Sequence, residues 1–228
     1  MPESVTAADG VRLNVIELGP PDGDVVLAVH GFASSAELNW IAAGWERPLT
    51  EAGYRLVAFD LRGHGASDRP ADPDAYRLTT LAGDALRVLD AVGADRAHWL
   101  GYSLGSRLGL EVARIAPDRV RTLSLGGPAS ADPTADRLIT MADALGLDDP
   151  ALHAFATGVS TDAPPMPDAP LGIPTLVVAG TADDIAIGAE QLATRFGARF
   201  VELPGRTHTN AITSRAFKDA VLENLSTN

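Results

Sequence analysis

Short runs of consecutive apolar residues alternate along this chain with longer segments in which apolar residues recur every three or four positions. Val25 to Val29 and Leu56 to Phe59 are runs of the first kind. An unbroken apolar run of this length is typical of a strand covered on both faces, as in a parallel sheet. Leu78 to Val92 is a segment of the second kind, and its spacing predicts an amphipathic helix.

The same reading predicts strands and helices in alternation after an N-terminal hairpin, whose turn is Asp9-Gly10. The predicted strands are Val5 to Ala7, Val11 to Leu18, Asp24 to His30, Arg55 to Asp60, a strand ending at Tyr102, Val120 to Leu125, Thr175 to Ala179 and Arg199 to Leu203. The predicted helices are Trp45 to Ala52, Leu78 to Val92, Leu104 to Ala116, Ile187 to Phe196 and Ala211 to Leu225. Alternation of this kind indicates an α/β fold whose sheet is mostly parallel.

The segment from about 129 to 172 interrupts the alternation. It is rich in proline, and it is too polar to supply a central strand. Leu138, Met141 and Leu145 suggest one short amphipathic helix within it. We expect an insertion that lies over the sheet; the alternative is a disordered loop, above all from Thr161 to Pro170.

Composition limits the class of protein. A chain of 228 residues, 46% hydrophobic and 21% charged, is typical of one globular domain. The net charge is −12, and the sequence contains no basic stripe. We therefore expect neither nucleic acid nor an acidic membrane surface as a partner. There is no cysteine, no signal-peptide pattern at Met1 to Ser4 and no apolar run long enough to span a membrane, so we expect a cytoplasmic protein.

The most informative motif is Gly101-Tyr102-Ser103-Leu104-Gly105, which reads G-x-S-x-G between a predicted strand and a predicted helix. Glycines at both ends allow a sharp turn that holds a serine hydroxyl clear of the backbone. This context is the one that a nucleophile elbow requires. Ser103 is therefore the candidate nucleophile, although the pattern also occurs in loops without function.

Other chemistry-bearing residues follow the predicted strands. In an open parallel sheet, functional groups collect at the carboxyl ends of the strands. His30-Gly31-Phe32 follows one strand, the segment from Asp60 to Ser67 follows the next, and Asp183 and His208 each come just after a later strand. The chain order is therefore serine, acid, histidine.

These motifs together resemble the α/β-hydrolase superfamily, in its branch of serine esterases and lactonases with a short lid. The resemblance rests on H-G-F at His30, D-x-R-G-H-G-x-S from Asp60 to Ser67, G-x-S-x-G and the later acid and histidine. It covers the chain from the hairpin to the last helix. It implies a single domain over 1–228, with helices on both faces of a twisted sheet and a lid-like insertion at about 129–172.

The resemblance implies a role for each candidate. Ser103 attacks a carbonyl, His208 takes its proton, and Asp183 orients His208. The family's G-x-x-D spacing from Gly180 selects Asp183, and Asp184 stays the alternative.

The resemblance also implies an oxyanion hole and a pocket. Two backbone N–H groups, of Phe32 and Leu104, would stabilise the oxyanion. The side chains of Phe32 and Tyr102 are candidates for the substrate pocket, with ordinary packing as the alternative for each.

Other polar residues receive structural interpretations. His30 and His64 lie in glycine-containing turns that hold loops together in similar hydrolases, and structural roles are also favoured for His98 and His153. The cluster from Asp60 to Ser67 is interpreted as a clasp beside the catalytic loops. No spacing resembles a metal site and no glycine-rich motif opens a helix toward a phosphate, so we expect neither a metal nor a cofactor.

Two departures from the family pattern stand beside the elbow and the histidine. The elbow continues with Ser106 and Arg107 where a small residue is common, which predicts slightly altered packing of the helix on the sheet. His208 follows Thr207 where glycine is common. Neither departure removes a catalytic group.

The short lid bears on the substrate. It should leave the site open and admit water, which hydrolysis tolerates. The sequence thus predicts cleavage of small or medium carboxylic esters; the alternatives are a lactonase or enol-lactone hydrolase and, in another class, a ligand-sensing protein. Epoxide hydrolases and haloalkane dehalogenases of this fold use an aspartate nucleophile, and Ser103 argues against both. The sequence contains no pattern from which the oligomeric state could be predicted.

Overall fold

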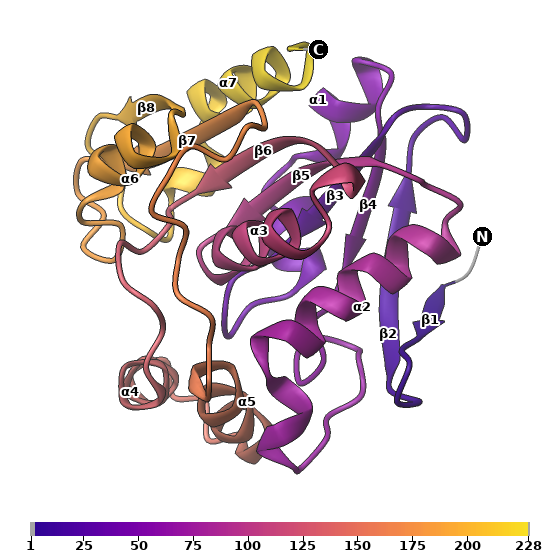
Figure 1. Ribbon diagram of the computed structural model, residues 1–228, viewed down its shortest axis with the longest axis vertical. Coiled ribbons are helices and arrows are strands. Elements are labelled where there is room, and N and C mark those ends of the chain that lie inside the picture. Colours follow the sequence, from indigo (N-terminus) through magenta and orange to yellow (C-terminus); the bar gives the residue numbers. More distant parts are fainter. Residues whose placement is uncertain (1–2, 228) are drawn as a thin grey trace.

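The computed structural model describes residues 3–227 and contains an eight-stranded sheet in the order β1-β2-β4-β3-β5-β6-β7-β8 (Figure 1). β1 pairs with β2, and β2 with β4, in antiparallel fashion, whereas the pairings from β4 to β8 are all parallel. The expected α/β fold, mostly parallel with an antiparallel N-terminal hairpin, is confirmed.

The strands lie close to their predicted positions. They are β1 (Ser4–Thr6), β2 (Arg12–Leu18), β3 (Val25–Val29), β4 (Arg55–Phe59), β5 (Ala97–Tyr102), β6 (Val120–Gly126), β7 (Thr175–Gly180) and β8 (Arg199–Leu203). The residues of β3, β4 and β5 are all buried, as the unbroken apolar runs predict for the centre of a sheet.

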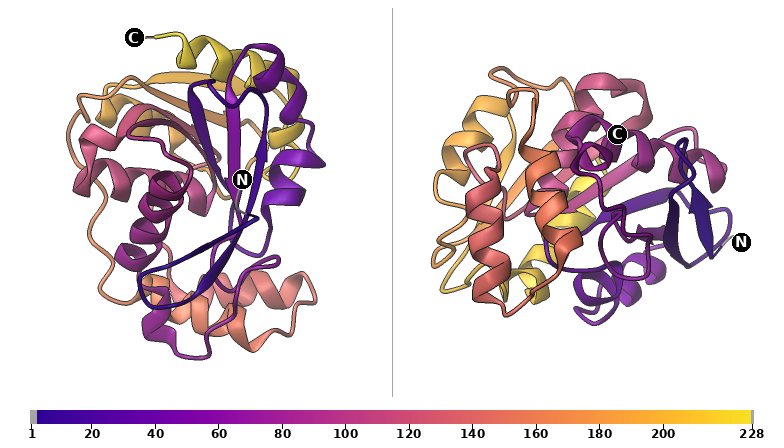
Figure 2. Two further views of the ribbon diagram at one scale, coloured as in Figure 1. Left: turned by 90° about the vertical axis from the view of Figure 1, so that its right-hand side faces the viewer. Right: turned by 90° about the horizontal axis from the view of Figure 1, so that it is seen from below.

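Helices cover both faces of the sheet (Figure 2). The helices are α1 (Glu46–Glu51), α2 (Leu78–Ala91), α3 (Leu104–Ile115), α4 (Ala135–Ala144), α5 (Pro150–Ser160), α6 (Ala189–Phe196) and α7 (Arg215–Leu225), with short helical turns at Glu37–Ile41, Pro73–Tyr76, Pro117–Arg119 and Ala211–Thr213. α2, α3 and α6 pack on one face, and α1 and α7 on the other. Each face therefore has its own apolar core.

Two helices begin later than predicted because of their backbone. Gly188 adopts a left-handed φ of 87°, so α6 begins at Ala189 rather than at Ile187. Ser214 is extended, with φ −65° and ψ 132°, so only a single turn forms at Ala211–Thr213 before α7 begins. Both differences reflect local dihedral angles, which apolar periodicity does not specify.

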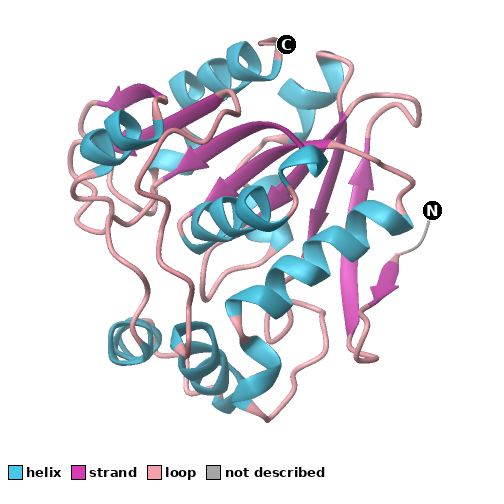
Figure 3. Ribbon diagram, in the orientation of Figure 1, coloured by secondary structure: helices cyan, strands magenta, loops and turns pink. Residues whose placement is uncertain are grey.

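The insertion contains two helices, not the single helix that the sequence suggests. α4 and α5 lie beyond the carboxyl ends of the strands and are joined to β6 and β7 by segments without helix or strand (Figure 3). We call residues 127–134 the outgoing connector and residues 161–174 the returning connector. The returning connector, for which a disordered loop was the alternative, lies against the helix of Ser103 through contacts described below.

α5 was missed because its proline was read as an interruption. The Asp149 side chain accepts a hydrogen bond from the amide of Ala151, and Pro150 occupies the first turn, where its missing N–H costs nothing. Phe155, fully buried, anchors the helix against the rings of Phe32, His64 and Tyr76. The sequence signal for this helix was therefore present at Asp149-Pro150.

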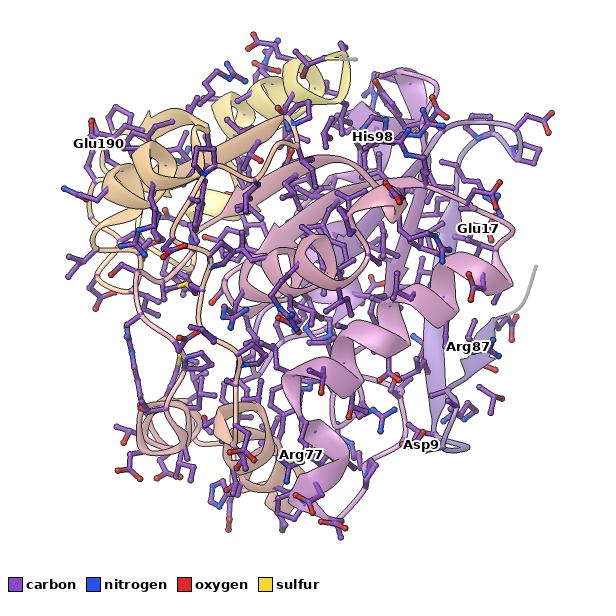
Figure 4. The ribbon with its side chains drawn as sticks, viewed as in Figure 1. Asp9, Glu17, Arg77, Arg87, His98 and Glu190 are labelled. Carbon is purple, nitrogen blue, oxygen red and sulfur yellow. The ribbon has the colours of Figure 1, made fainter. Side chains whose placement is uncertain are left out.

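The returning connector is also attached to the start of α2. Arg77 stands at the N-terminal end of α2 beside α5 (Figure 4). Its guanidinium pairs with Asp162 at 2.9 Å and with Asp74 at 2.8 Å.

Among the helices of residues 3–227, none has both the length and the apolar character needed to cross a membrane.

Candidate active site

Ser103 occupies a strained turn between β5 and α3. Its φ of 54° and ψ of −114° are rarely adopted by a residue with a side chain. Such strain persists only where the surrounding structure holds it, and it clusters at functional sites. The predicted strand-turn-helix context of the G-x-S-x-G motif is thus present.

The glycines of the motif allow β5, β3 and α3 to approach one another closely. A Cβ atom at Gly105 would lie 2.0 Å from the Val29 carbonyl oxygen, and one at Gly101 would lie 2.4 Å from the Gly105 carbonyl oxygen. Both contacts are with backbone, which cannot move aside like a flexible side chain. Glycine is therefore required at both positions.

Ser106 adds a polar anchor beneath the turn. Its buried hydroxyl lies 3.0 Å from the Gly101 carbonyl oxygen and 2.9 Å from that of Gly126, so it links the start of α3 to the ends of β5 and β6. Glycine at this position could not make these two contacts.

His208 and Asp183 lie together after β8 and β7. His208 Nδ1 is 2.9 Å from Asp183 Oδ2 and 3.0 Å from Oδ1. Because an ionised carboxylate can only accept, Nδ1 carries the proton and Nε2 is left free to accept one. The pair therefore has the geometry of a general base with an orienting acid.

Backbone amides hold the Asp183 carboxylate in place. Asp183 Oδ1 also accepts hydrogen bonds from the amides of Ile185, at 3.0 Å, and Ala186, at 2.9 Å. Burial by itself would raise the pKa of this carboxyl, but the hydrogen bond from His208 and those from the amides outweigh it and lower the pKa. Asp183 therefore carries a negative charge beside the imidazole.

The neighbouring carboxylate has different surroundings. Asp184 is exposed, and among the described residues the His208 ring donates its hydrogen bonds to Asp183 alone. Of the two adjacent candidates, the structure pairs Asp183 with the histidine.

Ser103 and His208 line one cavity of about 650 Å³, together with Phe32 and Tyr102. Met141 of α4 and Leu145, which follows that helix, form part of its wall, so the lid contributes directly to this cavity.

Tyr102 holds His208 beside the elbow. Its hydroxyl donates to the His208 carbonyl oxygen at 2.5 Å, and the two ring centroids are 5.3 Å apart. Burial raises the pKa of the Tyr102 hydroxyl, which keeps it protonated as a donor. Sequence reasoning placed Tyr102 in the pocket but did not identify this positioning contact.

The loop after β3 is held at both sides of Phe32. The Gly31 amide donates to Asn39 Oδ1 at 3.0 Å, and the Ala33 amide donates to His64 Nε2 at 3.1 Å. A Cβ atom at Gly31 would lie 3.1 Å from Ser103 Cβ, so this loop passes directly beside the serine. Asn39 was missed by sequence reasoning because a lone polar residue in a surface turn carries no motif.

The amide of Leu104 is free of a partner within its own helix. Leu104 is the first residue of α3, and the first amides of a helix have no carbonyl partner within it. Helix N-termini also carry partial positive charge. The loop that contains Phe32 and the first residue of α3, Leu104, are thus both next to Ser103.

Three of the other four histidines make hydrogen bonds to neighbouring segments. His30 bonds the Gly31 carbonyl and the Leu61 amide, His64 bonds the Arg62 carbonyl and the Ala33 amide, and His98 bonds the Thr122 hydroxyl. Burial lowers the pKa of all three, to about 3 for His64 and about 4 for His98.

The segment from Asp60 to Ser67 is a clasp, as the sequence suggested. The buried Arg62 guanidinium donates to both oxygens of Asp84 at 2.6 Å and also to Asp9, which lies at the turn of the β1–β2 hairpin (Figure 4). Among residues 3–227, no three His, Asp or Glu side chains are grouped so that they could hold a metal ion.

Comparison with known proteins identifies the family. The family model of the alpha/beta hydrolase fold matches residues 24–155, which span β3 to α5 and include the elbow. This chain belongs to the α/β-hydrolase family. The hydrolase motifs of the sequence and the order of its strands agree with this assignment.

The hydrolase is similar to proteins with several activities. Epoxide hydrolase A of Mycobacterium tuberculosis is 36% identical over 125 residues, which cover 54% of this chain and 37% of that protein. The matched region thus spans well under half of that relative's length. A hydrolase from Pseudomonas aeruginosa has a TM-score of 0.82 and 26% identity, covering 98% of this hydrolase and 97% of that chain. An esterase from Exiguobacterium antarcticum has a TM-score of 0.83 and 21% identity, with both chains covered completely.

Proposed function

We propose that this hydrolase cleaves carboxylic esters through Ser103, His208 and Asp183. The observation that carries the proposal is the 2.9 Å contact between His208 and Asp183, made where His208 and the strained Ser103 line the same cavity. A serine hydroxyl needs a base to accept its proton, and that base needs a partner that fixes its tautomer.

The reaction follows from these positions. Ser103 Oγ bonds to the ester carbonyl carbon while its proton passes to His208 Nε2. The carbonyl electrons move to oxygen, and the amides of Phe32 and Leu104 stabilise that oxyanion. As the oxyanion collapses, the alcohol leaves with the proton from His208. Water then attacks the acyl-serine, His208 accepts its proton, and the acid is released as Ser103 regains the proton.

The two sides of Ser103 would hold different parts of the ester. His208 must deliver a proton to the leaving alcohol, so the alcohol lies on the His208 side, in the 650 Å³ cavity. Phe32 and Tyr102 line that cavity. A second cavity of about 60 Å³ is lined by Ser103 and Leu104 but not by His208. We therefore assign the acyl group to the second cavity.

The epoxide hydrolase relatives favour a different activity, but the elbow residue weighs against it. Opening an epoxide in this fold uses an aspartate at the elbow, and the elbow residue here is Ser103. The esterase of similar fold supports only the architecture, since its identity is 21%. Ester cleavage is therefore the activity that the site chemistry favours.

The test is the Ser103→Ala variant. Turnover of 4-nitrophenyl acetate should fall at least about 10⁴-fold, and a fluorophosphonate probe should label the unaltered chain once and the variant not at all. A panel of lactones run beside the esters tests the lactonase alternative. Undiminished ester turnover in Ser103→Ala would contradict the proposal.

A further inference from the structure

The second cavity beside Ser103 is apolar except for two arginines. Leu104 and Leu110 of α3, Leu138 and Met141 of α4, and Met166 of the returning connector supply its apolar lining. Arg107 and Arg137 are its basic residues, and no Asp or Glu among the described residues lines it. This is a local positive site in a chain whose net charge is −12.

Arg107 lies one helical turn after Ser103 and is buried beneath the lid connectors. Its side chain is 7% exposed. Nε donates to Asp132 of the outgoing connector at 2.7 Å, and Nη2 donates to the Pro164 carbonyl oxygen of the returning connector. These contacts fix the guanidinium between the two connectors.

One nitrogen of this guanidinium has no partner. Arg107 Nη1 is buried and makes no hydrogen bond within residues 3–227. Leaving a buried charged donor unsatisfied is costly, so nearly all such donors in native proteins have a partner. Arg107 also lines the second cavity, next to the proposed nucleophile, so its incompletely satisfied guanidinium can attract an anion there.

The charge of the site selects the kind of ligand. Asp132 neutralises one positive charge, and its side chain is 38% exposed, so part of its charge is screened by solvent. Arg137 adds a second cation to the lining. A carboxylate in this cavity fits the remaining positive charge, because guanidinium groups bind carboxylates through strong charge-assisted hydrogen bonds.

We propose that the acyl group of the substrate ends in a carboxylate that binds the cations of Arg107 and Arg137 in the second cavity, so that the preferred substrates are monoesters of dicarboxylic acids. This inference rests on the proposed ester cleavage and on the assignment of the acyl group to the second cavity. The lining between Ser103 and Arg107 is apolar, which fits the methylene chain that separates the two carbonyl carbons of such an acid.

The test compares two matched ester series. The first contains 4-nitrophenyl monoesters of dicarboxylic acids from glutarate to suberate, and the second contains 4-nitrophenyl alkanoates of equal chain length. At one chain length, kcat/KM for the monoester should exceed that for the alkanoate by about 10- to 100-fold, the usual effect of one hydrogen bond to a charged group. In Arg107→Met this ratio should fall to about one or below.

The control is an arginine outside the site. Arg87 is exposed on α2 and is labelled in Figure 4, so Arg87→Met removes the same charge from the chain and should keep the preference for monoesters. Arg107→Lys keeps the charge and should retain part of it. A merely structural role for Arg107 would change turnover of both series alike and leave their ratio unaltered.

A binding measurement separates this inference from the proposed function. In Ser103→Ala, which cannot form the acyl-enzyme, adipate and its neighbours in chain length should raise the melting temperature, whereas Arg107→Met in the same background should abolish the shift. Equal rates for the two series at every length, or a preference that survives Arg107→Met, would overturn the inference and leave ester cleavage standing. Absence of ester turnover together with an Arg107-dependent shift would overturn the proposed function and the monoester substrates, and would leave only the carboxylate-binding site at Arg107 standing.

Discussion

At the residue scale, the contact that matters most is the one between His208 and Asp183. The two adjacent carboxylates at 183 and 184 have the same chemistry but different surroundings, since Asp183 is buried and bonded to two amides while Asp184 is exposed. If the triad is correctly assigned, only one of the two should matter for catalysis.

We predict that Asp183→Asn lowers kcat for 4-nitrophenyl acetate by about 10³- to 10⁴-fold. The amide can donate to His208 Nδ1, which would place the imidazole proton on Nε2, where it blocks proton acceptance. Asp184→Asn is the matched control and should change kcat less than about threefold. Steady-state kinetics on both variants decide the matter, and the prediction fails if the two variants lose activity equally.

Residue chemistry was readable from the sequence to the extent that motifs encode it. Ser103 and His208 stand where strand-end reasoning placed them, because a parallel sheet brings the carboxyl ends of its strands to one edge. The choice between Asp183 and Asp184 needed the backbone, and the free Nη1 of Arg107 needed the lid connectors. Three-dimensional contacts of this kind leave no periodic signal.

At the element scale, the elbow depends on how closely α3 approaches β3. A side chain at Gly105 would meet the backbone of Val29 and His30, at distances from 2.0 to 2.9 Å. The helix α3, whose Leu104 amide is proposed to stabilise the oxyanion, therefore packs directly on β3.

We predict that Gly105→Ala lowers the free energy of unfolding by about 3 kcal/mol, since α3 would have to move away from β3. Gly83→Ala is the matched control: Gly83 lies in α2, and a Cβ atom there would meet nothing within 4 Å. That substitution should raise stability by about 0.5 to 1 kcal/mol through helix propensity. Urea unfolding measures both, and equal stability of the two variants would be inconsistent with the close approach.

Elements were predictable where apolar periodicity decides them and not where single residues do. β3 and β4 fall within their predicted ranges because their apolar runs end at polar turns. α5 was hidden by Pro150, and the start of α6 by the left-handed Gly188. Capping residues and positive φ angles therefore account for much of the difference.

At the scale of the whole molecule, three buried histidines link stability to pH. Burial lowers the pKa of His30, His64 and His98 from the usual 6.5. The unfolded chain binds protons at these rings below about pH 6.5, whereas the folded chain binds none until about pH 4 at His98 and about pH 3 at His64. Stability is thus fully present above pH 6.5 and falls as the pH falls toward 4.

We predict a free energy of unfolding that falls between pH 6 and pH 4.5 by up to about 1.4 kcal/mol per pH unit for each histidine. His98→Asn should remove the share of one proton from this slope. Urea unfolding at several pH values gives the slope for both chains. A free energy that is independent of pH over this range would show that these rings are already charged in the folded protein.

The strand order has a consequence for how the molecule is made. β7 and β8 form one edge of the sheet and are the last strands in the chain, and the acid and the base follow them. During synthesis, Ser103 and the loop that contains Phe32 are translated long before His208, the proposed base. The proposed triad is therefore complete only after the C-terminal edge of the sheet has docked onto the rest of the core.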